Sequence, residues 1–302
     1  MALSGKKILV AGGSGFIGTN LIARLLRNNA DVLNVDVSSN RFVKARTIQD
    51  DLLTSDFSFL EQERFDCVYH LVALSNPRMC EDIEKAFQVN VNLTVRLLNA
   101  LKDNPPQKIV LLSSYTIYSE DVPQPLTEDT PLSYFHNNYT LTKALQEQAA
   151  LYFAHTFSLP VLIFRVANIY GPYQEWRRFP NFLPQICLQA LEEKKIEIWN
   201  PNPMRDWIFI DDAVDAMIAA LDSDYTGVLN LGTGIGTSAG AIAETVAAHS
   251  GVSLTRLDKP VTGPMKAICD ISRITKELNW NPQTSLEEGI KETYEFYKEL
   301  MG

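Results

Sequence analysis

The stretch that most constrains the fold is Ile8–Gly18, where a short apolar segment leads into a glycine-rich turn. Glycines recur at every third position, and apolar residues follow at helical spacing, so the stretch predicts a buried strand, a tight turn and an amphipathic helix. Glycine lets the backbone approach a phosphate, and the N–H groups that open the next helix attract an anion. The turn therefore predicts dinucleotide binding, although such turns also join strands to helices with nothing bound.

An acid at the end of the second predicted strand indicates which dinucleotide is bound. Asp36 closes the apolar stretch 31–36, about 20 residues beyond the glycines, where a carboxylate hydrogen-bonds the adenosine ribose. Its charge also repels a 2′-phosphate, so the sequence favours NAD over NADP. Arg41, five residues further on, could soften that preference.

The charge balance limits the kinds of partner. The 302 residues carry a formal net charge of −9, which speaks against a nucleic-acid or anionic-membrane partner. No apolar run approaches the ~20 residues that span a bilayer, and we expect no signal peptide before the first strand. The four cysteines lack metal-ligand spacing and are expected to be buried thiols. We therefore expect a cytoplasmic protein with no metal site.

Predicted strands alternate with helices through residue 166, which is typical of an α/β fold with a doubly wound parallel Rossmann sheet. The rhythm changes at Asn168. We therefore expect an NAD-binding Rossmann domain at 1–167, joined by 206–232, and a smaller, interleaved mixed α/β substrate domain at 168–302. The ligand site is expected in the cleft between the two domains, at the carboxyl ends of the strands.

Two expectations concern helices of the second part. The helix after the strand near 207–210 is expected to be capped by Asp212. The segments 271–278 and 286–300 are expected to be short surface helices.

A tyrosine and a lysine four residues apart suggest proton transfer. Tyr139 and Lys143 would share one helix face, and the ammonium would lower the phenol pKa from its usual value near 10. Such pairs also occur in purely structural helices. Ser113 and Ser114, however, end a predicted strand at the same sheet edge as the glycine turn. A Ser–Tyr–Lys set beside a nicotinamide predicts proton transfer coupled to hydride transfer.

The whole pattern resembles the extended short-chain dehydrogenase/reductases. Within them it is similar to the NAD-dependent nucleotide-sugar epimerases and dehydratases, of which UDP-glucose 4-epimerase is typical. The resemblance covers almost the whole chain and rests on motifs in the right order: Gly12–Gly18, Asp36, Asp51-Leu52, His70–Ala73, Asn90, Ser113-Ser114, Tyr139-x-x-x-Lys143, Arg165–Pro172, Arg205–Asp212, Asn230–Gly232 and Leu278–Pro282.

The resemblance implies a role for each matching residue. For the cofactor, it implies contacts from Gly12, Gly15, Phe16, Ile17, Asp36, Asp51, Leu52, Leu71, Val72, Ala73, Asn90, Tyr139 and Lys143. For the substrate, it implies Ser114 at the sugar oxygen and Asn168 and Arg205 at the diphosphate, with Lys266 as a weaker substitute for a second phosphate-binding arginine. It also implies a homodimer formed through the helices at 83–101 and 138–157. His70 reads as a structural residue.

Three departures from the family pattern narrow the reaction. The 4,6-dehydratases carry an Asp-Glu pair after the active-site hydroxyl, and this chain has Tyr115 and Thr116 there, which disfavours dehydration. Ser119 stands where a glycine commonly follows the loop tyrosine, and the stretch 261–266 replaces an Arg-Pro-Gly-Asp-like motif. If the resemblance to the family is set aside, the adjacent Arg205 and Asp206 are interpreted as a surface ion pair.

We therefore expect a nucleotide-sugar epimerase that inverts its substrate through a transient 4-keto sugar, with Ser114, Tyr139 and Lys143 as catalytic residues. One alternative is an NAD(P)H-dependent keto-sugar reductase or dehydrogenase. A lower-ranked alternative is a non-catalytic NAD(H)-binding sensor or scaffold.

Overall fold

The protein is described by a computed structural model that covers residues 3–175, 177–178, 180–257, 259–260 and 263–302. Its largest sheet has seven parallel strands in the order β10-β6-β5-β4-β1-β2-β3. The doubly wound parallel sheet expected from the sequence is therefore confirmed. The strands are β1 (Lys7–Ala11), β2 (Asp31–Asp36), β3 (Arg46–Gln49), β4 (Cys67–His70), β5 (Lys108–Ser114), β6 (Val161–Val166) and β10 (Gly227–Leu231).

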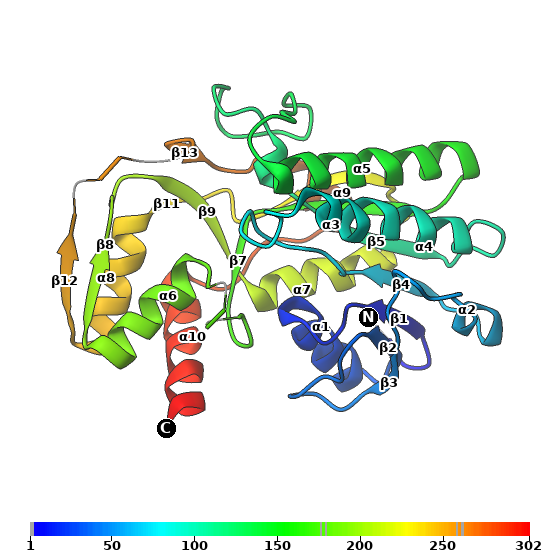
Figure 1. Ribbon diagram of the computed structural model, residues 1–302, viewed down its shortest axis with the longest axis horizontal. Helices are drawn as coiled ribbons and strands as arrows, with labels where there is room; N and C mark the ends of the chain where they lie inside the picture. Colours follow the sequence, from blue (N-terminus) through cyan, green and yellow to red (C-terminus); the bar gives the residue numbers. More distant parts are fainter. Residues whose placement is uncertain (1–2, 176, 179, 258, 261–262) are drawn as a thin grey trace.

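Helices cover both faces of this sheet (Figure 1). One face carries α1 (Phe16–Arg27) and α7 (Ile210–Ala219), and the other carries α4 (Leu93–Leu101) and α5 (Asn138–Phe157). Every residue of β4 and β5 is buried, as expected for parallel strands covered on both sides. Because β1 lies between β2 and β4, the glycine turn leaves the sheet where the strand order reverses, which is the usual ligand crevice of such sheets.

The helices on the α4–α5 face differ in regularity. The predicted helix at 83–101 consists of α3 (Ile83–Ala86), a π-helical turn at Phe87–Asn92 and α4. In contrast, α5 has the predicted bounds. Its start is set by Asn137, whose side chain accepts the Thr140 N–H, and it ends at Ser158, which is left-handed with φ 55°.

Most of the remaining elements gather at one end of the molecule (Figure 1). A four-stranded sheet places β9 (Met204–Phe209) between β11 (Gly236–Ser238) and β13 (Lys266–Ala267), with β7 (Asn168–Tyr170) also pairing with β9. A two-stranded sheet pairs β8 (Lys195–Ile198) with β12 (Ser253–Arg256). The end that carries these two small sheets also holds α6 (Phe182–Leu188), α8 (Ala239–Ser250) and α10 (Leu286–Met301). Of the two other helices, α2 (Phe59–Gln62) precedes β4 in the chain and α9 (Ser272–Leu278) contacts β10.

The stretch 206–232 is divided between the two parts. β9 belongs to the four-stranded sheet, whereas β10 belongs to the seven-stranded sheet and α7 packs on α1. No helix in the described part of the chain is long and apolar enough to cross a membrane.

One helix expectation is wrong. Asp212 does not cap α7, which begins at Ile210 without a side-chain cap. The Asp212 carboxylate instead accepts the N–H groups of Gln283 and Thr284, both at 2.9 Å, and so anchors the segment before α10. The helix expected at 286–300 is present as α10, which buries Ile290 and Tyr297 on one face and exposes the other.

Candidate active site

At the carboxyl end of β1, the glycine turn packs against the segment that directly follows β4. Gly12 has a φ of 88°, and a Cβ there would lie 2.8 Å from the Val72 N, so only glycine fits. A Cβ at Gly18 would lie 2.5 Å from the Gly13 Cα, so this glycine lets α1 pack onto the turn. At Gly15 the nearest protein atom would be 3.7 Å away. The chain itself leaves room over Gly15, which lines a cavity.

The first turn of α1 faces the same cavity. Phe16 and Ile17 line it, no side chain caps the helix, and the first turn carries no acid. The first N–H groups of a helix have no partner within the helix and form the positive end of its dipole. This arrangement suits a pyrophosphate.

The Asp36 carboxylate lies beside this turn. One oxygen accepts the Ser14 N–H at 3.0 Å, and the other accepts the Ser38 N–H at 3.1 Å. The Ser38 hydroxyl also donates to this second oxygen at 3.4 Å. Because a carboxylate has about four acceptor positions, about one remains for a ribose hydroxyl. Asp51 and Leu52 lie further along the sheet edge. The Asp51 carboxylate accepts the Leu53 N–H, and the Leu52 side chain is buried.

A cavity of about 410 Å³ opens at the carboxyl edge of the large sheet. Its volume falls within the usual range for small-molecule sites. Asn90, predicted among the cofactor contacts, does not line it. Its side chain is fully buried, accepts the Leu74 N–H and donates to Thr142 Oγ1, so it ties the loop after β4 to α5. The predicted residues that the cavity brings together are Gly12, Gly15, Phe16, Ile17, Leu71, Val72, Ala73, Ser114, Tyr139, Lys143 and Asn168.

Unpartnered polar atoms concentrate in this cavity. Among the described side chains, the buried polar atoms without a hydrogen-bond partner are His70 Nδ1, Ser113 Oγ, Gln174 Oε1 and Trp207 Nε1. All four residues line the cavity. Since buried polar atoms are normally paired, their concentration marks a place for a polar ligand. The sequence assigned no role to Gln174 or Trp207, although Trp207 lies within the Arg205–Asp212 motif.

Tyr139 and Lys143 lie one turn apart on α5 and both line the cavity. Burial raises the pKa of the Tyr139 phenol to about 12, and the neighbouring Ser114 hydroxyl opposes this rise. Burial lowers the pKa of Lys143 to about 7. The Lys143 Nζ donates to the Leu112 carbonyl and to Gln146 Oε1, both at 2.5 Å. The expectation that Lys143 lowers the Tyr139 pKa is therefore wrong for this arrangement, because burial raises that pKa and the two hydrogen bonds of Lys143 are made to Leu112 and Gln146 instead.

Ser114 ends β5 and shares its hydroxyl with the next turn. Its Oγ lies 2.9 Å from Thr116 Oγ1, and the Thr116 N–H points to it at 3.3 Å. The intervening Tyr115 is buried, and its hydroxyl accepts a hydrogen bond from Asn168 Nδ2 at 2.8 Å. These contacts place the Ser114 hydroxyl, the Tyr115 hydroxyl and the Asn168 amide along one wall.

The two predicted phosphate-binding cations lie in a neighbouring cavity. Arg205 and Lys266 line a space of about 190 Å³, which shares Tyr115 and Thr116 with the larger cavity. They come together because β13 pairs with β9 in the second sheet. Of the stretch 261–266, Val261 and Thr262 lie outside the described residues.

Asp206 is not part of a surface ion pair, so that reading of Arg205 and Asp206 is wrong. The Asp206 carboxylate is fully buried and accepts the N–H groups of Thr233 and Gly234, at 2.8 and 3.0 Å. The Arg205 guanidinium donates to the Met204 carbonyl. Asp206 therefore holds the loop after β10, and Arg205 stays directed to the cavity that it lines.

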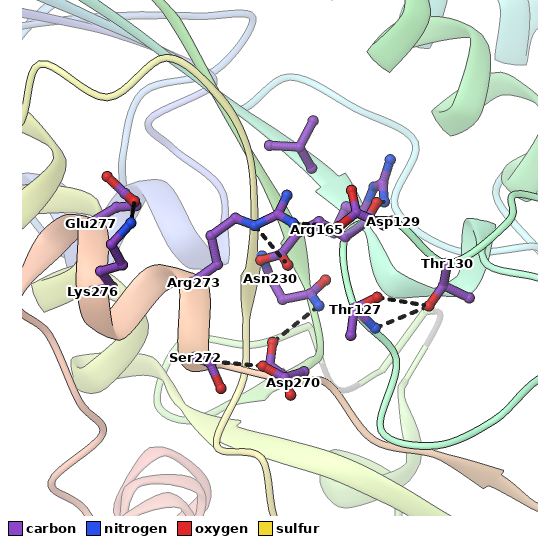
Figure 2. Close-up of polar contacts among 12 residues, drawn as sticks. Thr127, Asp129, Thr130, Arg165, Asn230, Asp270, Ser272, Arg273, Lys276 and Glu277 are labelled. Atoms are coloured by element: carbon purple, nitrogen blue, oxygen red, sulfur yellow. Dashed lines mark hydrogen bonds and ion pairs between the residues drawn. The ribbon is translucent and has the colours of Figure 1, made fainter.

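A buried ion pair supports α5 behind Lys143. Glu147 is fully buried and accepts from Arg165 of β6, with the Nη2–Oε1 distance at 2.5 Å. Arg165 also donates to the Tyr118 hydroxyl and the Glu128 carbonyl. Asn230 of β10 lies opposite Arg165 in the strand register, and Figure 2 draws both side chains among the polar contacts of this region. The network links α5 to the sheet edge and so fixes the helix that carries Tyr139 and Lys143.

The chain is similar to known proteins over most of its length. The model of the NAD dependent epimerase/dehydratase family matches residues 8–232. The UDP-glucose 4-epimerase of Mycolicibacterium smegmatis is 29% identical over 317 residues, which cover 97% of this chain and 98% of that protein.

Solved structures are similar over nearly the whole chain. The UDP-glucose 4-epimerase of Thermotoga maritima, solved with UDP-glucose, has a TM-score of 0.91 and 25% identity, covering 98% of this chain and 100% of that one. The UDP-glucuronic acid 4-epimerase of Bacillus cereus, solved with UDP-glucuronic acid and NAD, has a TM-score of 0.87 and 28% identity, covering 97% and 99%.

Proposed function

Because the chain belongs to the NAD-dependent epimerase/dehydratase family, we propose that it epimerises the sugar of a nucleotide-diphosphate sugar through a transient 4-keto intermediate. The observation that carries this proposal is the cavity that gathers the glycine turn, Ser114, Tyr139 and Lys143 at one sheet edge. It is supported by relatives that are named 4-epimerases of UDP-sugars.

The residues at the sheet edge fit NAD. Room over Gly15, the open first turn of α1 and the unpartnered Ser113 Oγ suit a phosphate-rich, polar ligand. When bound, NAD takes up a hydride from the sugar and gives it back. We assign it to the unit predicted at 1–167 with 206–232, and the nucleotide sugar to 168–302.

Each predicted contact has a place in this proposal. Gly12, Gly15, Phe16 and Ile17 would hold the pyrophosphate and Asp36 the adenosine ribose. Asp51 and Leu52 would border the adenine, Leu71, Val72 and Ala73 the nicotinamide side, and Tyr139 and Lys143 its ribose. Asn90 would act through the loop that it ties to α5.

On the substrate side, Tyr139 would accept the proton of the C4 hydroxyl in its phenolate form, which the positive charge of bound oxidised nicotinamide would favour. The Ser114 hydroxyl would hydrogen-bond the same oxygen. Asn168 and Arg205 would hold the diphosphate, with Lys266 alongside. The sugar can then turn over in the cavity while its anchor stays in place. Tyr139 would then return the proton to the C4 oxygen of the inverted centre, so the reaction causes no net proton or redox change.

Product analysis tests the reaction. Incubation with UDP- and GDP-sugars is expected to give the C4 epimer, seen by NMR, with no accumulation of reduced nicotinamide. Tyr139 and Ser114 would handle only one oxygen, so one centre should change. A steady, stoichiometric absorbance change from the nicotinamide would instead support the reductase alternative. Unchanged sugars throughout would count against the epimerase.

The glycine turn gives a second prediction. Gly15→Ala is expected to weaken NAD binding about tenfold, or ~1.4 kcal/mol, because the methyl group takes the room left for the pyrophosphate. The fold should persist, since the new Cβ meets no protein atom within 3.7 Å and Gly15 has a φ of −81°. Calorimetric titration with NAD and the melting temperature measure the two effects.

Gly12→Ala is the contrasting variant. Its φ of 88° and the 2.8 Å approach to the Val72 N should lower stability by at least the ~1–2 kcal/mol of a left-handed non-glycine residue. If Gly15→Ala and the unmodified protein bind NAD with equal affinity, the turn does not contact the cofactor.

We also propose that two copies associate through α4 and α5. These helices lie side by side (Figure 1), and apolar side chains are exposed on them, with Val95, Tyr152 and Phe157 at 37, 59 and 39% exposure. Pairing two such faces would cover these side chains. Light scattering should give the mass of a dimer, and Tyr152→Glu should lower it; a monomer mass for the unmodified protein would contradict the proposal.

A cytoplasmic location is supported by the cysteines. Cys67, Cys80, Cys187 and Cys269 are all unpaired and buried, as is usual for proteins of reducing compartments. Cell fractionation with an antibody would test this, and recovery outside the cytoplasm would contradict it.

A further inference from the structure

Gln146 is a buried polar residue that the proposed mechanism does not use. It lies on α5 three residues after Lys143 and seven after Tyr139, so the three side chains share one helix face. It is only 1% exposed and lines the larger cavity. Burying a neutral amide is costly unless both of its ends are paired.

The hydrogen bonds fix the direction of the Gln146 amide. Its Nε2 donates to Thr94 Oγ1 at 3.0 Å. The Thr94 hydroxyl has one proton, which it donates to the Asn90 carbonyl at 2.9 Å, so toward Gln146 it can only accept. The amide oxygen must therefore point the other way, to the Lys143 Nζ at 2.5 Å.

The same reasoning fixes the state of His70. Since Thr94 accepts from both neighbours, His70 Nε2 is the donor of their 2.8 Å contact. His70 is neutral, because burial lowers its pKa to about 3, and its unprotonated Nδ1 has no partner. Hydrogen bonds through Thr94 and His70 therefore connect the Gln146 amide to β4 and fix its orientation.

Lys143 depends on few acceptors. An ammonium has three N–H groups, and two of them donate to the Leu112 carbonyl and to Gln146 Oε1. Because Lys143 lines the cavity, the third remains for a ligand. The titratable groups that face it are Tyr139 and Glu147 on α5, Cys80 before α3, and His70 on β4; Glu147 is itself paired with Arg165.

We propose that Gln146 is a positioning residue, which keeps the buried Lys143 protonated and directs its remaining N–H to the nicotinamide ribose of NAD. The inference rests on the proposed function for the identity of that ligand. Without the amide oxygen, Lys143 keeps a single neutral acceptor, and its charged form becomes harder to maintain near neutral pH.

Two variants at this position should act in opposite directions. Gln146→Met keeps the volume but removes the acceptor, and should weaken NAD binding about tenfold, as expected when a hydrogen bond to a charged group is lost. The pH above which NAD affinity declines should move down. Gln146→Glu supplies a carboxylate, which stabilises the ammonium, so that pH should move up. Calorimetric titration with NAD from acidic to alkaline pH measures both effects, and the pH profile of kcat should move in parallel.

Gln148→Met is the matched control, since Gln148 is on the same helix but exposed. It should change neither NAD affinity nor its pH dependence. If both Gln146 variants keep the pH dependence of the unmodified protein, the proposal is overturned, even where Gln146→Met lowers the melting temperature. Should Gln146→Met fail to fold, the upward shift in Gln146→Glu decides the matter. Absence of NAD binding in the unmodified protein would instead overturn the proposed function.

Discussion

Tyr139→Phe is expected to lower kcat by a factor of about 10²–10⁴, the range for loss of one acid–base group. The ring still fills the same space on α5, so the fold and the cavity wall should remain. Only the hydroxyl that would exchange the C4 proton is lost. NMR of the sugar product gives the rate, and calorimetric titration gives the NAD affinity, which should fall far less than the rate.

Tyr152→Phe provides the control for this prediction. Tyr152 is on the same helix but does not line the cavity, and phenylalanine keeps its ring on the proposed dimer face, so turnover should persist. Turnover that survives in Tyr139→Phe would make the catalytic assignment wrong. NAD binding without any turnover, in the unmodified protein as well, would favour the non-catalytic sensor or scaffold.

Glu147→Gln is expected to lower the free energy of unfolding by about 3–5 kcal/mol, the usual cost of removing one partner of a buried ion pair. Glu147 is fully buried, and two nitrogens of Arg165 donate to it. The variant leaves the guanidinium without its counter-charge inside the protein. Urea unfolding measures the loss from the shift of the midpoint at unchanged slope.

Glu244→Gln is the matched change at the surface. Glu244 pairs with Arg256, and both side chains are about half exposed, at 56 and 49%. Such pairs contribute about 0–1 kcal/mol, so the variant should be nearly as stable as the unmodified protein. If both variants lose the same free energy of unfolding, burial does not increase the contribution of the Arg165–Glu147 ion pair to stability.

Features that depend on neighbours in the chain were predictable from the sequence. The strand, glycine turn and helix at 7–27 follow from hydrophobic spacing and from the backbone freedom of glycine. The bounds of α5 were also predicted, because its start is set by Asn137, three residues from the N–H that it accepts. Asp212 shows the opposite case, since its carboxylate binds N–H groups 71 and 72 residues further on, so no local pattern could exclude a cap.

The fold class, NAD as the cofactor and the grouping of Ser114, Tyr139 and Lys143 followed from the sequence, since motif order and short spacings carry that information. How these three groups are held follows only from the packing of distant segments. The two acceptors of Lys143 include a carbonyl 31 residues away, and the amide of Gln146 is oriented by a threonine 52 residues away. Burial and hydrogen-bond direction arise when β5, α4 and α5 pack together, so they have no signature in a spacing. The residue types at the sheet edge indicate the chemistry, and the packing behind them sets the protonation state of Lys143 and the direction of its N–H groups.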